Sequence, residues 1–300
     1  MSATKIFLQT RARMGNAIFR YLAGALFCVL YGFQLTESDA DLHKTIDDTY
    51  FLQWMHEYQR TGQLPALDTS KNYRFDGYFQ HDKVYVKHKE DLLQYIRDHP
   101  EDRVRSDDGR SIHAMELLMD ASSSSVPSYE VVLHLRLEDF ILEGQTIHPD
   151  GIRSFLEKQC DFWSSPQLTI VMKQPTMEIE HKYIEYVTKD WKEGGRTVKM
   201  ESNDLMRDFH IMKNARILIC SCSTLSWTAA LLSDSLETVY MPYHINHPGR
   251  IWETFRKPVE DTRASFPNTE CSIYTLGKIL GVHVPLPKTR LTTRFRQLTR

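Results

Sequence analysis

The sequence lacks the features that would place the chain in a specialised class of protein. It has no excess of one charge, since 37 Lys and Arg residues oppose 39 Asp and Glu residues for a formal net charge of -2. A strongly basic nucleic-acid-binding protein is therefore not expected. Its most apolar stretch, residues 21–33, is shorter than the roughly 20 residues of a membrane-spanning helix, and Arg20 precedes it. We expect a buried helix there.

Cysteines are few, and no secretory leader is visible. The five cysteines are scattered and odd in number: Cys28, Cys160, Cys220, Cys222 and Cys271. This usage favours reduced thiols in a reducing compartment. The opening MSATKIFLQT has no basic segment followed by an apolar core and a small-residue cleavage site. These features predict a cytoplasmic protein with no membrane span.

What is present indicates an ordinary two-domain globular protein. The chain has 300 residues, 41% hydrophobic and 25% charged, which is enough for two cores. Residues 121–128 (ASSSSVPS) have the composition of a flexible connection. We therefore predict an N-terminal domain at 1–120, a linker at 121–128, a second domain at 129–286 and a basic tail at 287–300. The tail is expected to be solvated rather than a patch for anionic partners.

Apolar periodicity predicts an α/β fold. In the first half it indicates a strand at 5–9, a helix at 16–30, helical patterning at 45–60 and 87–98, and strands within 72–86. In the second half it predicts strands at 129–137, 167–172, 197–201, 215–221 and 237–242, with helices at 151–163, 178–191, 204–214 and from 225. Such alternation predicts a parallel sheet with helices on its faces. A ligand is then expected beyond the carboxyl ends of the strands.

The first candidate cluster is VVLHLRLEDF, residues 131–140. In a strand, Leu133, Leu135 and Leu137 would share one face and His134, Arg136 and Glu138 the other. Charged groups near the end of a buried strand need partners or a ligand. The planar fork of an arginine suits a phosphate. The alternative is a structural ion pair between Arg136 and Glu138.

The second cluster is ILICSCSTLSWTAALL, residues 217–232, an apolar strand that leads through hydroxyl residues into a helix. The free N–H groups at the start of that helix favour an anion, and a diphosphate would fit. The hydroxyl donors around it are Ser221, Ser223, Thr224 and Ser226. The alternative is ordinary helix capping. Cys220 and Cys222 lack the further spaced ligands of a metal site, so no metal is expected.

The third cluster is QTRARMGNAIFRY, residues 9–21, where a strand turns into the predicted buried helix. Gly15 permits an unusual backbone conformation or the close approach of a ligand, and Asn16 offers a donor and an acceptor beside it. The alternative is that both residues only serve the turn, since Gly and Asn are common there.

Taken in order, these clusters resemble the motifs of the inverting fucosyltransferases, and most closely those of the alpha-1,2-fucosyltransferases of glycosyltransferase family eleven. The matching segments are MGNAIFRY at 14–21, FDGYFQ at 75–80, HLRLED at 134–139 and STLSWTAA at 223–230. The sequence departs from the family before the Gly-Asn pair, where it has Ala12 and Arg13 and Gly is usual, at Ala17, where Gln is usual, and at Cys222, Leu225 and Thr228. It also has LTIVMKQP at 168–175 where the family strand ends in Ser-Asp-Asp.

The resemblance implies two facing Rossmann-like domains of the GT-B type. It implies transfer of L-fucose from GDP-fucose to a hydroxyl of an acceptor glycan, with an alpha-1,2 linkage, inversion and no metal ion or other cofactor. The second domain would hold the nucleotide sugar, and the first would contact the acceptor oligosaccharide or glycoconjugate. Because a eukaryotic Golgi enzyme of this kind carries a membrane anchor, a bacterial or viral origin is expected.

The resemblance also implies roles for individual residues. Arg136 would bind the diphosphate and stabilise the leaving charge, His134 would orient the donor, and Asp139, or else Glu138, would accept the acceptor's proton. Asp208 would face the nucleoside or brace the serine loop. The implied donor-binding set is Gly15, Asn16, His134, Arg136, Asp208, Ser221, Ser223, Thr224, Leu225 and Ser226. Two alternatives stay open: another nucleotide-sugar donor, or a glycan-binding protein without catalysis.

Overall fold

The fold is described from a computed structural model of the 300-residue chain. The description covers residues 4–10, 13–39, 42–80, 82–119, 129–144, 146–158, 165–244, 265–268, 270–271 and 273–284. The predicted serine-rich linker at 121–128 and the basic tail at 287–300 lie outside the described residues.

The first half contains a small sheet of four parallel strands. These are β1 (Lys5–Leu8), β2 (Gln34–Thr36), β3 (Lys44–Ile46) and β4 (Tyr73–Phe75), in the order β2-β1-β4-β3. The other elements are α1 (Met14–Tyr31), α2 (Asp48–Thr61), α3 (Asp82–Lys87), α4 (Lys89–Asp98), the antiparallel strands β5 (Arg103–Arg105) and β6 (Ser111–His113), and the 3-10 helix η1 (Ala114–Leu117). Residues 72–86, expected to hold strands, therefore supply β4 and then a helix.

The second half is built on six parallel strands. They are β7 (Tyr129–His134), β9 (Gln167–Val171), β10 (Thr197–Glu201), β11 (Ala215–Ile219), β12 (Thr238–His244) and β13 (Ser265–Asn268). Their order, β10-β9-β7-β11-β12-β13, is the doubly wound order 3-2-1-4-5-6. The helices are α5 (Glu138–Glu143), α6 (Pro149–Lys158), α7 (Glu178–Glu193), α8 (Leu205–Lys213), α9 (Thr224–Leu231) and α10 (Ile273–Leu280). A short antiparallel pair joins β8 (Thr146–Ile147) to β14 (Glu270–Cys271).

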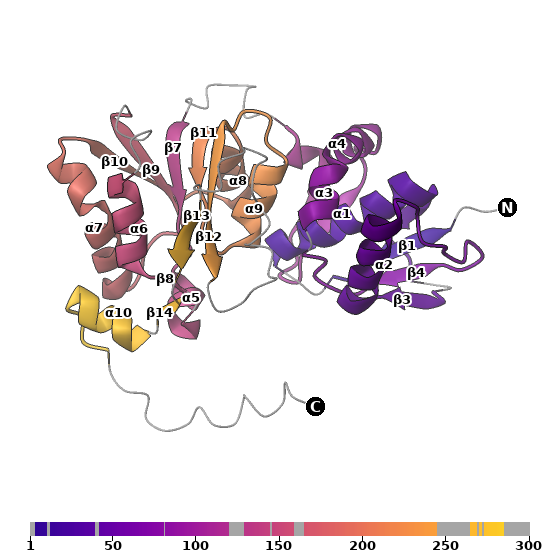
Figure 1. Ribbon diagram of the computed structural model, residues 1–300, viewed down its shortest axis with the longest axis horizontal. Helices are drawn as coiled ribbons and strands as arrows, with labels where there is room; N and C mark the ends of the chain where they lie inside the picture. Colours follow the sequence, from indigo (N-terminus) through magenta and orange to yellow (C-terminus); the bar gives the residue numbers. More distant parts are fainter. Residues whose placement is uncertain are drawn as a thin grey trace.

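Helices cover both faces of the six-stranded sheet. Side chains of α6 and α7 pack with Val131 and Leu133 on one face, whereas those of α8 and α9 pack with Val132 and Leu218 on the other. In Figure 1, α8 and α9 lie between this sheet and the first half of the chain. These features confirm the predicted fold class, two parallel α/β sheets with helices.

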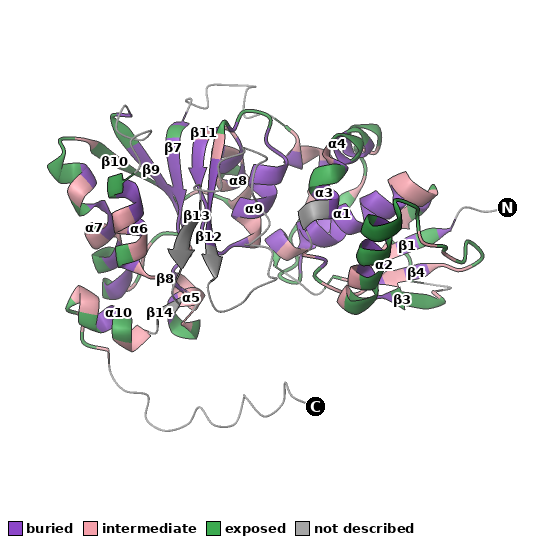
Figure 2. Cartoon of the chain, viewed as in Figure 1, coloured by how far each residue is buried: buried purple, intermediate pink, exposed green. Residues whose placement is uncertain are grey.

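Helix α1 forms the centre of the first half. By length and composition it is the one helix of the described residues that could cross a membrane, but 78% of it is buried inside the protein. Figure 2 shows this burial along most of its length. The helix ends at Gly32, whose φ of 69° allows its N–H to donate to the carbonyl of Cys28. The prediction of a buried helix in this region is confirmed.

The two halves share an apolar core. The rings of Phe19 in α1 and Trp227 in α9 stack with centroids 4.4 Å apart. Buried Lys213 of α8 donates to the carbonyl of Leu118, 2.8 Å away. Lys89 of α4 donates to the carbonyl of Ser233 at 2.6 Å. Direct packing of α1 on α9 therefore determines how groups from the two halves meet.

Candidate functional site

The carboxyl ends of β7 and β11 form the switch point of the larger sheet. The chain leaves β7 toward β9 on one side, whereas β11 and β12 continue on the other side. Doubly wound sheets bind ligands in the crevice that opens where these connections diverge. Arg136 after β7 and Ser221 after β11 line one pocket here. The structure thus brings the first and second predicted clusters together.

The strand that carries the first cluster is shorter than expected. β7 ends at His134, and Glu138 begins α5, so Glu138 does not share a strand face with His134 and Arg136. The expectation of a strand to residue 137 is wrong because the ladder of hydrogen bonds ends earlier. Leu133, Leu135 and Leu137 nevertheless pack in one apolar cluster, as the alternation predicted.

His134 is held in a buried and uncharged state. Its Nδ1 lies 2.8 Å from the Ser221 hydroxyl, which joins the ends of β7 and β11. Burial, assisted by the positive charge of Arg136, lowers the pKa of His134 to about 3. A neutral imidazole at this position can orient neighbouring groups by hydrogen bonding but carries no positive charge for phosphate.

The positive charge of the site comes from two arginines that share one carboxylate. Asp139 in the first turn of α5 pairs with Arg136 (Nη2 to Oδ2, 3.2 Å) and with Arg13 (Nη1 to Oδ2, 2.6 Å). The Arg136 guanidinium also lies 4.8 Å from the ring centre of Phe140. Arg13 comes from the first half of the chain, immediately before α1, and its side chain is 62% exposed. The Arg136–Glu138 ion pair considered from sequence is replaced by this three-residue cluster.

The two carboxylates predicted as candidate bases are both engaged. Burial acts to raise the pKa of Asp139, but its hydrogen bonds and charge interactions with Arg136 and Arg13 hold that pKa below the ordinary value. Glu138 pairs with Lys173, with Nζ 2.7 Å from Oε1. An anion held by cations is a weak base. In this arrangement Asp139 is not prepared to accept a proton.

The serine segment builds the start of α9. The Ser223 side chain accepts a hydrogen bond from the Leu225 N–H, as an N-cap does. The buried Ser226 hydroxyl donates to the Ser223 carbonyl at 3.0 Å. The capping alternative therefore describes part of this segment, while Ser221 lines the pocket at the crevice. Donor binding by Ser223, Leu225 and Ser226 stays a prediction.

Gly15 allows the two halves to approach closely. It lies in the first turn of α1, and a Cβ there would stand 2.4 Å from Thr224 Oγ1 and 2.8 Å from Leu225 N. The close approach predicted for a ligand is thus made by the start of α9. This contact also places Arg13 and the N-terminus of α9 near each other, although the two are separated by about 210 residues of sequence.

Asn16 links α1 to the FDGYFQ segment. Its side-chain oxygen accepts a hydrogen bond from Gln80 Nε2 at 2.8 Å. The segment itself is held by Asp48, which accepts from the N–H groups of Tyr78 (3.0 Å) and Phe79 (2.6 Å). Phe79 has a φ of 51°, which is uncommon for a residue with a side chain. A strained loop is therefore held against the start of α1.

Asp208 lies apart from the crevice. Its carboxylate accepts from both the backbone and side-chain N–H groups of Asn203 at 3.1 Å, beyond β10 and two strands from β7. Burial raises the pKa of Asp208 to about 6, assisted by the negative charges of Asp204 and Glu201 and opposed by the Asn203 bonds. Its hydrogen bonds with Asn203 brace the turn after β10 rather than the serine loop.

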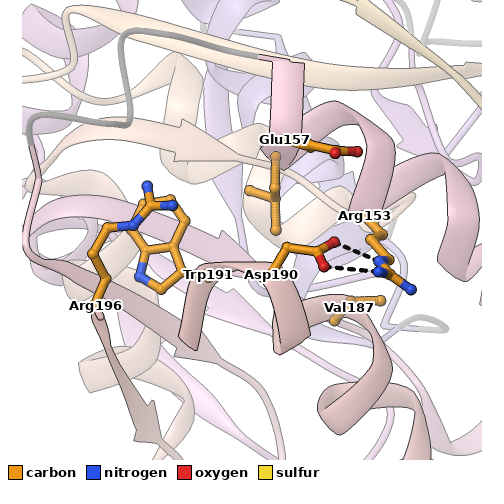
Figure 3. A pocket seen from close by; sticks show the side chains of 7 residues that line it. Arg153, Glu157, Val187, Asp190, Trp191 and Arg196 are labelled. Carbon is orange, nitrogen blue, oxygen red and sulfur yellow. Dashed lines mark hydrogen bonds and ion pairs between the residues drawn. The ribbon is translucent and has the colours of Figure 1, made fainter. Parts of the chain in front are cut away.

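A second pocket lies on the same face of the sheet, between α6 and the C-terminal half of α7 (Figure 3). Arg153 and Asp190 form a two-bond ion pair in it, and Arg196 lies 4.2 Å from the ring centre of Trp191. None of the predicted site residues lines it. Within the described ranges, no group of three or more His, Cys, Asp or Glu residues could hold a metal ion.

Sequence reasoning missed Arg13 as a site residue. It appeared only as a departure from the usual glycine, and no pattern of spacing connects it to Asp139, 126 residues away. Lys173, which pairs with Glu138, was missed for the same reason. Their positions follow from the packing of the two halves and of neighbouring strands.

Comparison with known proteins gives distant likenesses. No protein-family model matches the sequence, and no curated protein matches it. E. coli heptosyltransferase WaaC with ADP is similar over 93% of this chain and 99% of that chain, with 8% sequence identity and a TM-score of 0.44. The iron-containing dodecameric glycosyltransferase TibC from enterotoxigenic E. coli is similar over 99% of this chain and 72% of that chain, with 13% identity and a TM-score of 0.41. Both likenesses concern the fold alone.

Proposed function

We propose that this protein is a glycosyltransferase that transfers L-fucose from GDP-fucose to a hydroxyl of an acceptor glycan, with inversion and without a metal ion. The observation that carries the proposal is the paired arginines, Arg13 and Arg136, beside the N-terminus of α9 at the switch point. Two guanidinium groups and free helix N–H groups supply the charge and the donors that a diphosphate needs. The identities of the sugar and of the nucleotide base, and the alpha-1,2 linkage, are taken from the motif resemblance.

Donor binding would exchange partners within the arginine cluster. The diphosphate would take the place of the Asp139 carboxylate on Arg13 and Arg136. Because these arginines hold the pKa of Asp139 low, their transfer to phosphate would make Asp139 a stronger base. Arg13 comes from the first half of the chain, whereas Arg136 and Asp139 come from the second. The exchange would therefore hold the donor between the two halves.

The reaction would be a single displacement at the anomeric carbon. The acceptor oxygen forms a bond to that carbon as the carbon–oxygen bond to the diphosphate breaks, and the acceptor's proton passes to Asp139. Arg136 would stabilise the negative charge that develops on the leaving diphosphate. The neutral His134 would hold the Ser221 side of the crevice in position.

A different nucleotide sugar is the second candidate donor. The observation that favours it is the end of β9, where residues 172–175 read MKQP in place of the acidic family motif. Lys173 of this segment pairs with Glu138. Because these side chains differ from the acidic ones of the family, they would suit a nucleotide base or a sugar other than guanine and fucose.

The test is a donor panel with matched variants. Purified protein is incubated with GDP-fucose, ADP-heptose and UDP-sugars plus acceptor glycans, with and without EDTA, and products are measured by mass spectrometry. We expect turnover of GDP-fucose, a loss of about 100-fold or more in Arg136→Ala, and weaker donor binding in Arg13→Ala. Arg216→Ala, which breaks a surface pairing with Glu130 and Glu237, is the control. A folded, fully active Arg136→Ala variant would refute the assignment, and turnover of another donor alone would refute fucose.

A further inference from the structure

The loop after β4, residues 76–80, lies at the sheet edge from which the first half contributes Arg13. β1 and β4 are parallel neighbours that end together, and the Gln9 N–H after β1 donates to the Phe75 carbonyl at the end of β4, 3.1 Å away. Arg13 follows shortly after Gln9 and pairs with Asp139 of the second half. The loop therefore stands on the first-half side of the arginine cluster.

Side chains from three helices anchor this loop. They are Asp48 of α2, Arg20 and Asn16 of α1, and Tyr85 of α3. Arg20 is 3% exposed, and its guanidinium donates to the Gly77 carbonyl at 3.0 Å. The buried Tyr85 hydroxyl donates to the Phe79 carbonyl at 2.8 Å. Because a buried charge is costly unless it is hydrogen-bonded, the bond from Arg20 holds the loop firmly in place.

The loop is also strained. The φ of 51° at Phe79 lies in the left-handed region, and the ring of this residue is buried. Residues with side chains keep this conformation only where the surrounding structure enforces it, and such positions concentrate at binding and catalytic sites. Of residues 76–80 only Tyr78 is exposed, at 50%. The anchors and the strain thus present the ring of Tyr78 to solvent on a rigid support.

We propose that Tyr78 is a platform for the acceptor, and that its ring stacks on the C–H face of a hexopyranose unit. This inference rests on the proposed function. The face of an aromatic ring is negative, whereas the C–H bonds on one face of a pyranose present weakly positive hydrogens, so the two faces attract each other. A tyrosine on a rigid loop loses little conformational freedom on binding.

The position of the loop favours the acceptor over the donor as the ligand of Tyr78. Arg136 and Ser221, which line the pocket at the switch point, belong to the second half. Tyr78 belongs to the first half, on the other side of the Arg13 pairing with Asp139. An acceptor sugar held on Tyr78 would therefore approach the donor from the opposite side of the crevice.

Fluorine NMR of the protein labelled with fluorotyrosine tests the contact without donor or turnover. The probes are methyl β-D-galactoside, methyl β-D-glucoside and methyl α-D-mannoside, and Tyr78→Phe assigns the Tyr78 signal by removing it. We expect at least one glycoside to shift that signal at concentrations on the order of millimolar, as is usual for a single stacked ring. Sorbitol, an open-chain polyol with no ring face, is the control ligand and should leave the signal unchanged.

Kinetics with the donor and acceptor found in the donor panel separate binding from a structural role. Tyr78→Ala should raise the KM for the acceptor roughly 5- to 30-fold, with kcat and donor affinity changed by less than about 2-fold. Tyr78→Phe and Tyr78→Trp keep an aromatic face and should retain a KM close to that of wild type. Tyr50→Ala is the matched control, because Tyr50 is also exposed, at 39%, but lies in α2 outside the loop. All of these variants should keep the wild-type Tm within about 1 °C, since exposed side chains contribute little to stability.

The possible failures are distinct. If none of the three glycosides shifts the Tyr78 signal, or if Tyr78→Ala weakens donor binding rather than acceptor binding, the platform is wrong. If a nucleotide sugar is turned over and Tyr78→Ala matches wild type in its KM for the acceptor, the platform is wrong and the proposed function stands. If a glycoside shifts the Tyr78 signal but no nucleotide sugar is turned over, the sugar contact stands and the proposed function is wrong.

Discussion

The substitution Gly15→Ala tests how closely the two halves must pack. The added Cβ would stand 2.4 Å from Thr224 Oγ1 and 2.8 Å from the backbone nitrogen of Leu225. Thr224 can rotate its hydroxyl, but Leu225 N belongs to the first turn of α9. To restore ordinary contact, α1 and α9 must separate by at least about half an ångström. Overpacking of this kind costs about 1–3 kcal/mol.

The control is the same substitution in the same helix. A Cβ at Gly24 would meet Leu8 Cδ2 at 2.8 Å and Leu35 Cδ2 at 2.9 Å, which are ends of flexible side chains. Their displacement is offset by the gain of about 0.5–1 kcal/mol for alanine over glycine within a helix. Gly24→Ala should therefore leave stability nearly unchanged.

Thermal unfolding and donor titration measure the difference. We expect Gly15→Ala to lower Tm by on the order of 5 °C and to weaken donor binding, because the start of α9 moves away from Arg13. The reasoning is refuted if Gly15→Ala matches wild type in both measurements, or if Gly24→Ala is equally destabilising.

Two predictions concern ionisation. Burial raises the pKa of Asp208 to about 6, so ionisation of this group weakens the fold as the pH rises from about 4 to above 6. Asp208→Asn should therefore gain in Tm over wild type as the pH rises through this range, with little gain at pH 4. Asp190→Asn is the control of opposite sign, since hydrogen bonds from Arg153 lower the pKa of Asp190, and the wild-type advantage there should shrink as the pH falls. A pH-independent Asp208→Asn difference would contradict the first expectation. His134, with a pKa lowered to about 3 by burial, should show no change in its NMR ring shifts between pH 5 and 8. The His134→Gln spectrum assigns the signal, and a midpoint near 6.5 would show that the imidazole is not buried as described.

Much of the fold could be predicted because local pattern and tertiary environment agree. Alternating apolar segments identified the strand at 197–201 and the helix at 178–191 within two residues of their observed bounds. The pattern failed at residues 135–137, which keep the alternation of a strand although β7 has ended at His134. Periodicity indicates which side chains are buried, and burial continued there although only the Leu135 N–H, which donates to the Val171 carbonyl of β9, still pairs with a neighbouring strand.

The candidate site was only partly predictable. His134 is the last residue of β7, and Arg136 and Ser221 follow β7 and β11, which end at one edge of the sheet, so their approach follows from parallel topology. The partners of the charged residues at this site differ from those expected from the sequence. Asp139 appeared as a base by position in a motif, but its two arginines make it an anion bound in a cluster. Glu138, expected beside Arg136, pairs with Lys173 instead.

Local sequence was sufficient for the alternation of strands and helices over residues 167–231, for the buried character of α1 and for the hydroxyl-rich start of α9, because each depends on residues close together in the chain. The ion pair of Arg13 with Asp139 and the contact of Gly15 with Leu225 depended on tertiary structure. These features arise where surfaces from distant segments of the chain meet. A pattern within one segment does not predict which other segment will pack against that segment.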